Sequence, residues 1–425
     1  MPHPPSRPSN AGNVLAMPLK LRKLVASQRI IIRINLASRK RTWTTHDRIE
    51  GTVAITPPTD TRFDEIDIEF VGTSRTYIER LTTAAAVSGR SQAFHQFLKL
   101  QQPGLSARYP EDGVLRAAQT YELPFVFVIP PQLLPRVCRH KVASEAVREA
   151  HLCLPPTLGD KDAAHAKDTL DDMAPDMASV RYGIFCSISR VKAHDGDEPS
   201  RVTLASKARK LRVIPATSEL PPLDVGGVGS DYVLHREKNV RKGMLKGKLG
   251  VLTMEAAQPQ PLHMRLSDPD SRPSTMATVM LRFDPSEPCS PPPRLSTLSS
   301  KLKVCTFFAS SARHAFPCKE TSVLDMSQGC HTESLPLSSR CVANVEWTAC
   351  DPAKPHTIER RDSACSTTTS TSLHAGEVPA PSPAYKGTTY YSARLLIPLS
   401  LPTHKAFVPT FHSCLSQPRL PAQAR

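Results

Sequence analysis

A short apolar run between prolines constrains the fold of this chain more than any other feature. Residues 121–135 read Tyr-Glu-Leu-Pro-Phe-Val-Phe-Val-Ile-Pro-Pro-Gln-Leu-Leu-Pro. The β-branched and aromatic residues from Phe125 to Ile129 are too few for a buried helix and predict a strand. Pro124 has no N–H to donate to a sheet, so this strand begins there or lies at a sheet edge. Such runs between long proline-rich loops favour a β-sandwich over an enzyme with a compact pocket.

Five segments of the chain alternate apolar and polar residues with a period of two. Their apolar rows are Ile30, Ile32, Ile34 and Leu36; Ile66, Ile68 and Phe70; Val180, Tyr182, Ile184 and Ile188; Ala277, Val279, Leu281 and Phe283; and Ala393, Leu395, Ile397 and Leu399. This alternation is typical of antiparallel sheets with one face in a core and one in water. The only competing pattern is a predicted two-turn helix at residues 144–150. The sequence therefore predicts an all-β fold.

Composition and length set the domain organisation. A chain of 425 residues has room for two or three domains with their own cores. Its 41 prolines are about twice the usual share of roughly 5%. We expect a disordered basic tail at 1–25, a first sandwich at 26–215, a linker at 216–230, a second sandwich at 231–405 with a disordered loop at 351–383, and a tail at 406–425.

Several segments, taken in order, resemble the strands of a known family. In the first half, Asp47-Arg-Ile-Glu-Gly-Thr-Val-Ala-Ile55, Arg62-Phe-Asp-Glu-Ile-Asp-Ile-Glu-Phe-Val-Gly72, residues 121–135 and Val180-Arg-Tyr-Gly-Ile184 resemble strands of an arrestin N-domain. In the second half, Val240-Arg-Lys-Gly243, residues 247–261 and Phe407-Val-Pro-Thr-Phe-His412 resemble an arrestin C-domain and arrestin-like proteins of filamentous fungi. The resemblance runs from about Arg29 to Cys414. It implies two tandem immunoglobulin-like β-sandwich domains.

The resemblance also implies a function. Arrestin-like proteins are non-enzymatic cytoplasmic adaptors that bind membrane-protein cargo or its regulators in endocytic trafficking, ubiquitylation or signalling. They are recruited to the plasma membrane or endosomes, bind through edge strands and concave faces, and need no cofactor. Many recruit ubiquitin ligases through Pro-Pro-x-Tyr motifs, which dock in WW domains. This chain has no such motif, and its nearest segment is Pro381-Ser-Pro-Ala-Tyr385. A ubiquitin ligase stays a candidate partner, and another protein could supply it.

Two other classes of function stay open. The first is a β-sandwich interaction module that regulates a kinase or transcription partner and has no cargo role. The second is a hydrolase on a β-sandwich, for which the chain offers no nucleophile elbow, no His-Glu-x-x-His and no phosphate-binding Gly-x-x-x-x-Gly-Lys. Gly226-Gly-Val-Gly229 is interpreted as part of the linker because no strand-to-helix unit follows it.

Two Cys/His pairs flank the predicted helix. Cys138-Arg-His140 and His151-Leu-Cys153 offer two thiolates and two imidazoles, a set that binds zinc tetrahedrally. The one-residue spacing matches none of the usual zinc fingers, although a loop can accommodate it. The alternative is a small buried Cys138 with histidines that face solvent or cap the segment. We therefore predict no metal and keep Cys138, His140, His151 and Cys153 as candidate ligands.

The charge favours acidic partners. The net charge is +15, and aromatic residues make up only 5% of the chain, so anionic lipid headgroups and phosphorylated tails fit better than nucleic acid. The candidate anion-binding residues are Arg39, Lys40, Arg41, Arg241 and Lys242. Each basic residue near an anionic membrane contributes about 1 kcal/mol. The alternative is ordinary solvated loops.

The compartment follows from features that the sequence lacks. No run approaches the roughly 20 apolar residues needed to span a bilayer. Basic residues interrupt the apolar stretch at 14–26, as a signal peptide would not allow. The 11 cysteines are scattered and odd in number, unlike a disulfide framework. We expect a reduced, cytoplasmic protein.

Two further expectations concern the second half of the chain. Arg360-Arg-Asp-Ser363 precedes a hydroxyl-rich run, which makes Ser363 a candidate phosphosite beside a basic surface. Residues 416–425 are polar and interrupted twice by proline, where an arrestin-like domain would continue into a closing strand. We therefore expect the second sandwich to be incomplete at its C-terminal edge, with an exposed neighbouring strand and lower stability.

Overall fold

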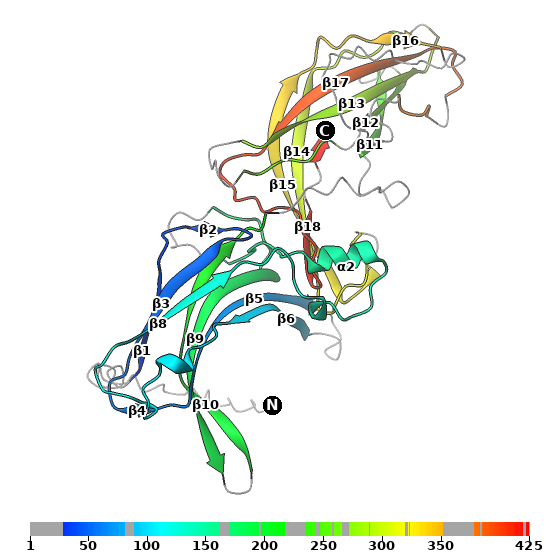
Figure 1. The fold of residues 1–425 in the computed structure, drawn as a ribbon. Coiled ribbons are helices and arrows are strands. Elements are labelled where there is room, and N and C mark those ends of the chain that lie inside the picture. The colour runs from blue at the N-terminus through cyan, green and yellow to red at the C-terminus, as the bar shows by residue number, and fades with distance from the viewer. Residues whose placement is uncertain are drawn as a thin grey trace, which may run out of the picture.

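The computed structural model shows two β-sandwiches, here called the N-domain and the C-domain, joined end to end (Figure 1). The residues that the structure describes are 29–80, 89–160, 170–194, 197–216, 234–242, 247–256, 259–265, 272–288, 290–318, 322, 324–351, 378–382, 385–419 and 422–424. The tail predicted at 1–25 lies outside them, as do nearly all of the predicted linker and most of the loop predicted at 351–383. None of the helices in the described ranges is both long and apolar enough to cross a membrane.

The N-domain packs a three-stranded sheet on a five-stranded one. The first, in the order β1-β3-β8, consists of β1 (Ile31–Leu36), β3 (Arg48–Thr56) and β8 (Tyr121–Val128). The second, in the order β2-β10-β9-β5-β6, consists of β2 (Thr42–Trp43), β10 (Asp197–Val213), β9 (Ala178–His194), β5 (Glu65–Arg80) and β6 (Gly89–Gln101). All neighbours in both sheets are antiparallel except β2 and β10.

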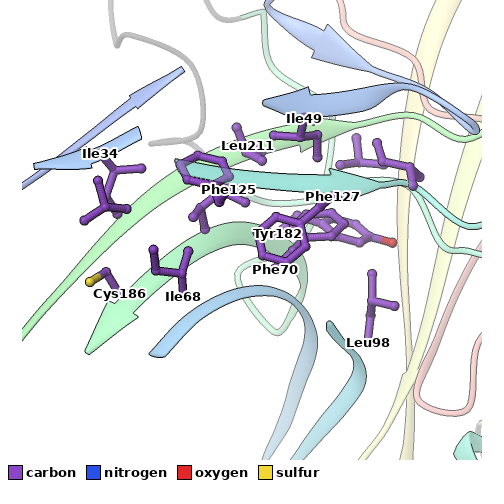
Figure 2. Packing of buried hydrophobic residues seen from close by; sticks show 14 of the residues in the cluster. Ile34, Ile49, Ile68, Phe70, Leu98, Phe125, Phe127, Tyr182, Cys186 and Leu211 are labelled. Atoms are coloured by element: carbon purple, nitrogen blue, oxygen red, sulfur yellow. The ribbon is translucent and has the colours of Figure 1, made fainter. Parts of the chain in front are cut away.

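One continuous apolar core fills the space between these two sheets (Figure 2). The alternating rows predicted from the sequence face it, as the buried side chains of Ile34, Ile68 and Tyr182 show. Phe70 stacks on Tyr182 with ring centroids 5.9 Å apart. The prediction for Pro124 was right in one of its two forms, since β8 begins earlier, at Tyr121, and lies at the edge of its sheet.

Short elements connect the strands of the N-domain. They are β4 (Thr61–Arg62), β7 (Val114–Leu115), the 3-10 helices η1 (Ser106–Arg108) and η2 (Pro135–Val137), and the helix α2 (Glu145–Leu152). The helix predicted at 144–150 is α2, with Ser144 as its N-cap. The Ser144 Oγ accepts a hydrogen bond from the backbone N–H of Val147 at 3.4 Å, as a first-turn cap should.

The C-domain also contains two sheets. The larger, in the order β11-β12-β13-β17-β16, consists of β11 (Leu234–Arg241), β12 (Lys248–Ala256), β13 (Ser274–Pro285), β17 (Tyr390–Ser400) and β16 (Thr348–Cys350). The smaller contains β15 (Gln328–Cys341), β14 (Thr297–Ala309) and β18 (Ser416–Arg419), with β19 (Ala422–Ala424) also paired to β14. The predicted rows on β13 and β17 face the core through Val279, Leu281 and Ile397.

The C-terminal segment differs from the tail predicted at 406–425. Val408 and Phe411 belong to the apolar core of the N-domain. Beyond them, β18 pairs Ser416 with Phe308, and β19 pairs Ala422 with Leu302, so both strands lie along β14. The expectation that this edge of the second sandwich is left open was therefore wrong. Proline is compatible with β18 because pairing to β14 on one side leaves its other side without a ladder.

Contacts from several segments, residues 401–419 among them, join the two domains. The Thr76 Oγ1 on β5 donates to the carbonyl of Ala309 at the end of β14, at 2.5 Å. Lys405 Nζ bridges Asp171 and Glu333 at 2.6 and 3.0 Å. Met173 packs into a buried cluster with Leu302, Val304, Leu335, Leu401 and Phe407. The domains therefore share an apolar and hydrogen-bonded junction, and β14 and β15 run toward it in Figure 1.

Candidate functional site

The outer face of the five-stranded N-domain sheet, together with β6 at the end of that sheet among the described strands, offers a surface for a partner. The strand β6 is last in the order of this sheet. Phe94, on β6, is 68% exposed and stands opposite Arg75 of β5. Phe185, on β9, is 42% exposed on the same face. An edge strand beside exposed aromatic side chains is suited to pairing with an extended peptide.

Several charged side chains on this face form ion pairs. Lys99 binds Glu69 at 2.8 Å, and Arg201 binds both Glu65 and Asp67. Lys210 lies 2.9 Å from a buried oxygen of Asp160. The face is thus a mixed surface of exposed rings and balanced ion pairs, although the chain as a whole is basic.

The candidate basic residues lie in two different domains. Arg39, Lys40 and Arg41 follow β1 and are exposed. Lys40 is paired with Asp47, and its Nζ lies 5.9 Å from the centre of the Trp43 ring. The pairing leaves Arg39 and Arg41 as the better anion-binding candidates in this loop.

The second basic pair lies at the end of β11. Arg241 is exposed and stands opposite Lys248 of β12. Lys242 Nζ binds Glu287 Oε2 at 2.6 Å. Because an internal carboxylate already compensates Lys242, Arg241 is the better anion-binding candidate of the two.

Three of the four candidate metal ligands come together, and a fourth residue joins them from far along the chain. The ligand atoms of Cys138, His140, His151 and Cys414 all lie within 4.8 Å of one another. The loop after η2 supplies Cys138 and His140, α2 supplies His151, and the segment before β18 supplies Cys414. We call these four residues the Cys/His cluster.

Cys153 lies apart from this cluster. It is the C-cap of α2, and its thiol donates to the carbonyl of Glu149 at 3.5 Å. Cys414 was not among the ligands predicted from the sequence, although His412-Ser-Cys414 has the same one-residue spacing as Cys138-Arg-His140 and His151-Leu-Cys153. That repeated spacing was the signal by which it could have been found.

Burial controls the protonation of the cluster in the absence of a cation. Desolvation, together with the nearby His140, His412 and Arg313, lowers the pKa of His151 to about 4. Desolvation and the neighbouring Cys138 thiol raise the pKa of Cys414 to about 12. Without a bound cation, the interior therefore holds these groups as a neutral imidazole and a neutral thiol.

The start of the segment closest to a ligase-recruiting motif, at residues 381–382, is packed against the C-domain. Arg282 and Asp284 form a buried ion pair on β13, with Nε and Oδ1 2.7 Å apart. The backbone N–H of Ser382 donates to Asp284 at 2.9 Å, and the carbonyl of Pro379 accepts from Arg282 at 3.2 Å. A segment bound in this way is not presented as a free extended peptide.

Ser363, the candidate phosphosite, lies outside the described residues.

The comparison with protein families agrees with the architecture described above. Residues 32–205 match the model of the N-terminal domain of arrestin, also called S-antigen. No curated protein matches the chain. The matched range begins in β1 and ends in β10, so it includes both sheets of the N-domain. The N-domain is therefore an arrestin-like N-terminal domain.

Proposed function

We propose that this protein is a non-enzymatic adaptor that binds extended segments of membrane proteins, or of their regulators, in endocytic trafficking. The family supports this proposal, because arrestins generally act by binding other proteins. The proposed place of action is the cytoplasm, with recruitment to the plasma membrane or endosomes. Ubiquitylation of the cargo would depend on a ligase brought by another protein, since Pro381-Ser-Pro-Ala-Tyr385 lacks the adjacent second proline of Pro-Pro-x-Tyr.

The observation that carries the proposal is the place of β6 at the end of its sheet, within the part of the chain that the structure describes. A strand at the end of a sheet presents unpaired backbone N–H and C=O groups, which an added strand can satisfy. On such a surface backbone hydrogen bonds supply affinity, while side chains set specificity. Phe94 projects from this strand with 68% of its surface exposed, beside Arg75 and Gln92, which hydrogen-bond to each other at 3.2 Å. An apolar anchor beside a cation suits a segment that alternates apolar and acidic residues.

Proximity labelling in cells tests this proposal. The full chain, fused to a labelling enzyme, should enrich plasma-membrane transporters and endosomal proteins. Phe94→Asp should remove most of that enrichment, because it places a charge where an apolar anchor is expected. The matched control is Val126→Asp, on the edge strand β8 of the other N-domain sheet, where the native side chain is also exposed.

Two results would contradict the proposal. Enrichment of kinases or transcription factors without membrane proteins would support the alternative interaction module. Equal labelling by wild type and Phe94→Asp would show that cargo binds elsewhere. Circular dichroism of both variants separates loss of binding from loss of fold.

A further inference from the structure

The Cys/His cluster lies at the junction between the two domains, and its residues come from segments far apart in the sequence. Cys138, His140 and His151 belong to the connection between β8 and β9 of the N-domain. Cys414 follows β17, which is the strand of the larger C-domain sheet that comes last along the chain, and it lies just before β18. We propose that these four residues bind a structural zinc ion that fastens the C-terminal segment to the N-domain.

The separations between the ligand atoms match a tetrahedral site. His140 Nε2 lies 3.3 Å from the sulfur of Cys138 and 3.3 Å from that of Cys414. His151 Nδ1 lies 3.6 Å from the sulfur of Cys138. Zinc bonds of roughly 2.3 Å to sulfur and 2.0–2.1 Å to nitrogen, at tetrahedral angles, place sulfur and nitrogen roughly 3.5 Å apart. The three measured separations lie within about 0.3 Å of this value, and all four ligand atoms lie within 4.8 Å of one another, so the cluster has the size that one cation needs.

The hydrogen bonding of His140 fixes which of its two ring nitrogens is unprotonated and can offer a lone pair to the cluster. His140 Nδ1 lies 3.1 Å from the carbonyl oxygen of Lys141. A carbonyl oxygen can only accept, so Nδ1 carries the proton and Nε2 has a bare lone pair. A backbone carbonyl bound to the second nitrogen is the usual support of a metal-binding histidine. A single lone pair accepts one S–H bond well, whereas a cation satisfies the lone pair and both sulfurs together.

His151 supports the same conclusion from the opposite side of the cluster. Its side chain is buried, and the sulfur of Cys138 is a weak hydrogen-bond partner for Nδ1 at 3.6 Å. Its Nε2 makes no hydrogen bond within the part of the chain that the structure describes. A buried imidazole with so little hydrogen bonding is costly. A metal–nitrogen bond replaces the weak contact with a strong one.

The backbone holds the ligands in place before any ion binds. The carbonyl of Cys414 accepts from the N–H of Arg313 at 2.8 Å. The carbonyl of Cys138 accepts from Arg148 Nη1, on α2, at 3.1 Å. The first bond holds the C-terminal segment against the loop after β14, and the second holds the Cys138 loop against α2. The two pairs are connected because the backbone N–H of Ala143 donates to the carbonyl of His314 at 2.7 Å. Binding therefore needs little rearrangement, which favours affinity.

The ligand set selects zinc and a structural role. Two thiolates with two imidazoles suit zinc by softness and geometry, and two thiolates cancel its charge. Four protein ligands leave no open position for a substrate or a reactive water, so the site is closed rather than catalytic. The main competing state is a disulfide between Cys138 and Cys414, which would leave both imidazoles with no metal to bind.

Metal analysis of the full chain tests the proposal. Protein prepared under reducing conditions with added zinc should hold about one ion per chain after desalting. Cys414→Ser should lower the affinity at least tenfold, whereas the matched control Cys153→Ser should retain the ion. Removing zinc from the wild type with a chelator should make residues 401–419 more accessible to protease and lower the melting temperature.

Cobalt provides a second readout, and its measurement on the wild type does not depend on the folding of any variant. Cobalt bound to the wild type should show tetrahedral absorption and thiolate-to-metal charge transfer, and Cys414→Ser should roughly halve the latter. The proposal is overturned if the folded wild type binds neither metal, or if the bound cobalt is octahedral. Equal loss of metal in Cys153→Ser and Cys414→Ser would also overturn it. So would a disulfide between Cys138 and Cys414 in the purified protein, which mass spectrometry detects as the loss of the two thiol hydrogens.

Discussion

The two sandwiches of this protein bury their sheets in different ways. In the N-domain, one continuous apolar cluster extends from Ile32 to Val213 and takes in Val408 and Phe411. In the C-domain, the apolar residues divide into two smaller clusters, and one of these includes Met173 of the N-domain. The C-domain also buries the Arg282–Asp284 ion pair on the outer side of its larger sheet. Similar architectures can therefore rest on different balances of apolar and polar burial.

The difference indicates how the domains depend on each other. A single large core can hold two sheets together by itself, since hydrophobic stabilisation grows with the apolar area buried. A domain with divided clusters gains more from neighbours, here from Met173 and from the C-terminal segment. We expect the N-domain to be the more independent of the two. The two tryptophans of the chain report on them separately, because Trp43 lies in the N-domain core and Trp347 packs against a C-domain cluster.

The largest effect should come from truncating the N-domain core. Phe125→Ala removes a fully buried ring on β8 and should lower the free energy of unfolding by about 3–5 kcal/mol. The fluorescence transition of Trp43 in urea measures this change, in a Trp347→Phe background. The control is Val126→Ala on the same strand, where the side chain is exposed and the change should stay within about 0.5 kcal/mol. Equal losses for the two variants would contradict a core of this kind.

Breaking the buried ion pair should destabilise the C-domain instead. Arg282→Met leaves Asp284 as an unpaired buried carboxylate and should cost about 3 kcal/mol. The Trp347 transition, in a Trp43→Phe background, should shift to lower urea. The matched control Arg394→Met, at an exposed position on β17, should change little. If Arg282→Met, placed separately in a Trp347→Phe background, moves the Trp43 transition by the same amount, the domains unfold as one unit and the comparison fails.

Adding a methyl group at a closely packed glycine should lower the free energy of unfolding by a smaller amount in either domain. A Cβ on Gly51 would lie 2.1 Å from the carbonyl oxygen of Asn35, and one on Gly250 would lie 2.4 Å from that of Asp284. Gly51→Ala and Gly250→Ala should each cost about 1–3 kcal/mol, because neighbouring backbone must shift. Each should move the transition of its own domain. Gly89→Ala has no atom within 4 Å of the added Cβ and serves as the neutral control.

Much of the fold could be predicted from the sequence, because alternation is a local property of a strand. Each of the five predicted rows lies on a strand that faces a core. The N-cap of α2 was equally readable, since a serine before a helix satisfies a backbone N–H of the first turn. The burial of Arg282 and Asp284 could not be predicted in this way, because alternation places both residues on the face of the strand that is expected to meet solvent. They are buried because residues 378–382 and 385–390, which lie more than ninety positions later in the chain, cover that face.

The candidate metal site shows the same division. Two Cys/His pairs could be identified by their spacing, yet spacing alone selected Cys153 in place of Cys414. The choice depends on where the C-terminal segment passes, and this is decided by the burial of Val408 and Phe411 and by the pairing of β18 with β14. By itself the sequence determined the alternating rows, the helix and the resemblance of the N-domain to arrestin, because these follow from neighbouring residues. Only the tertiary structure decided the edge pairing, the covered ion pair and the Cys/His cluster, because each depends on contacts between residues distant in the chain.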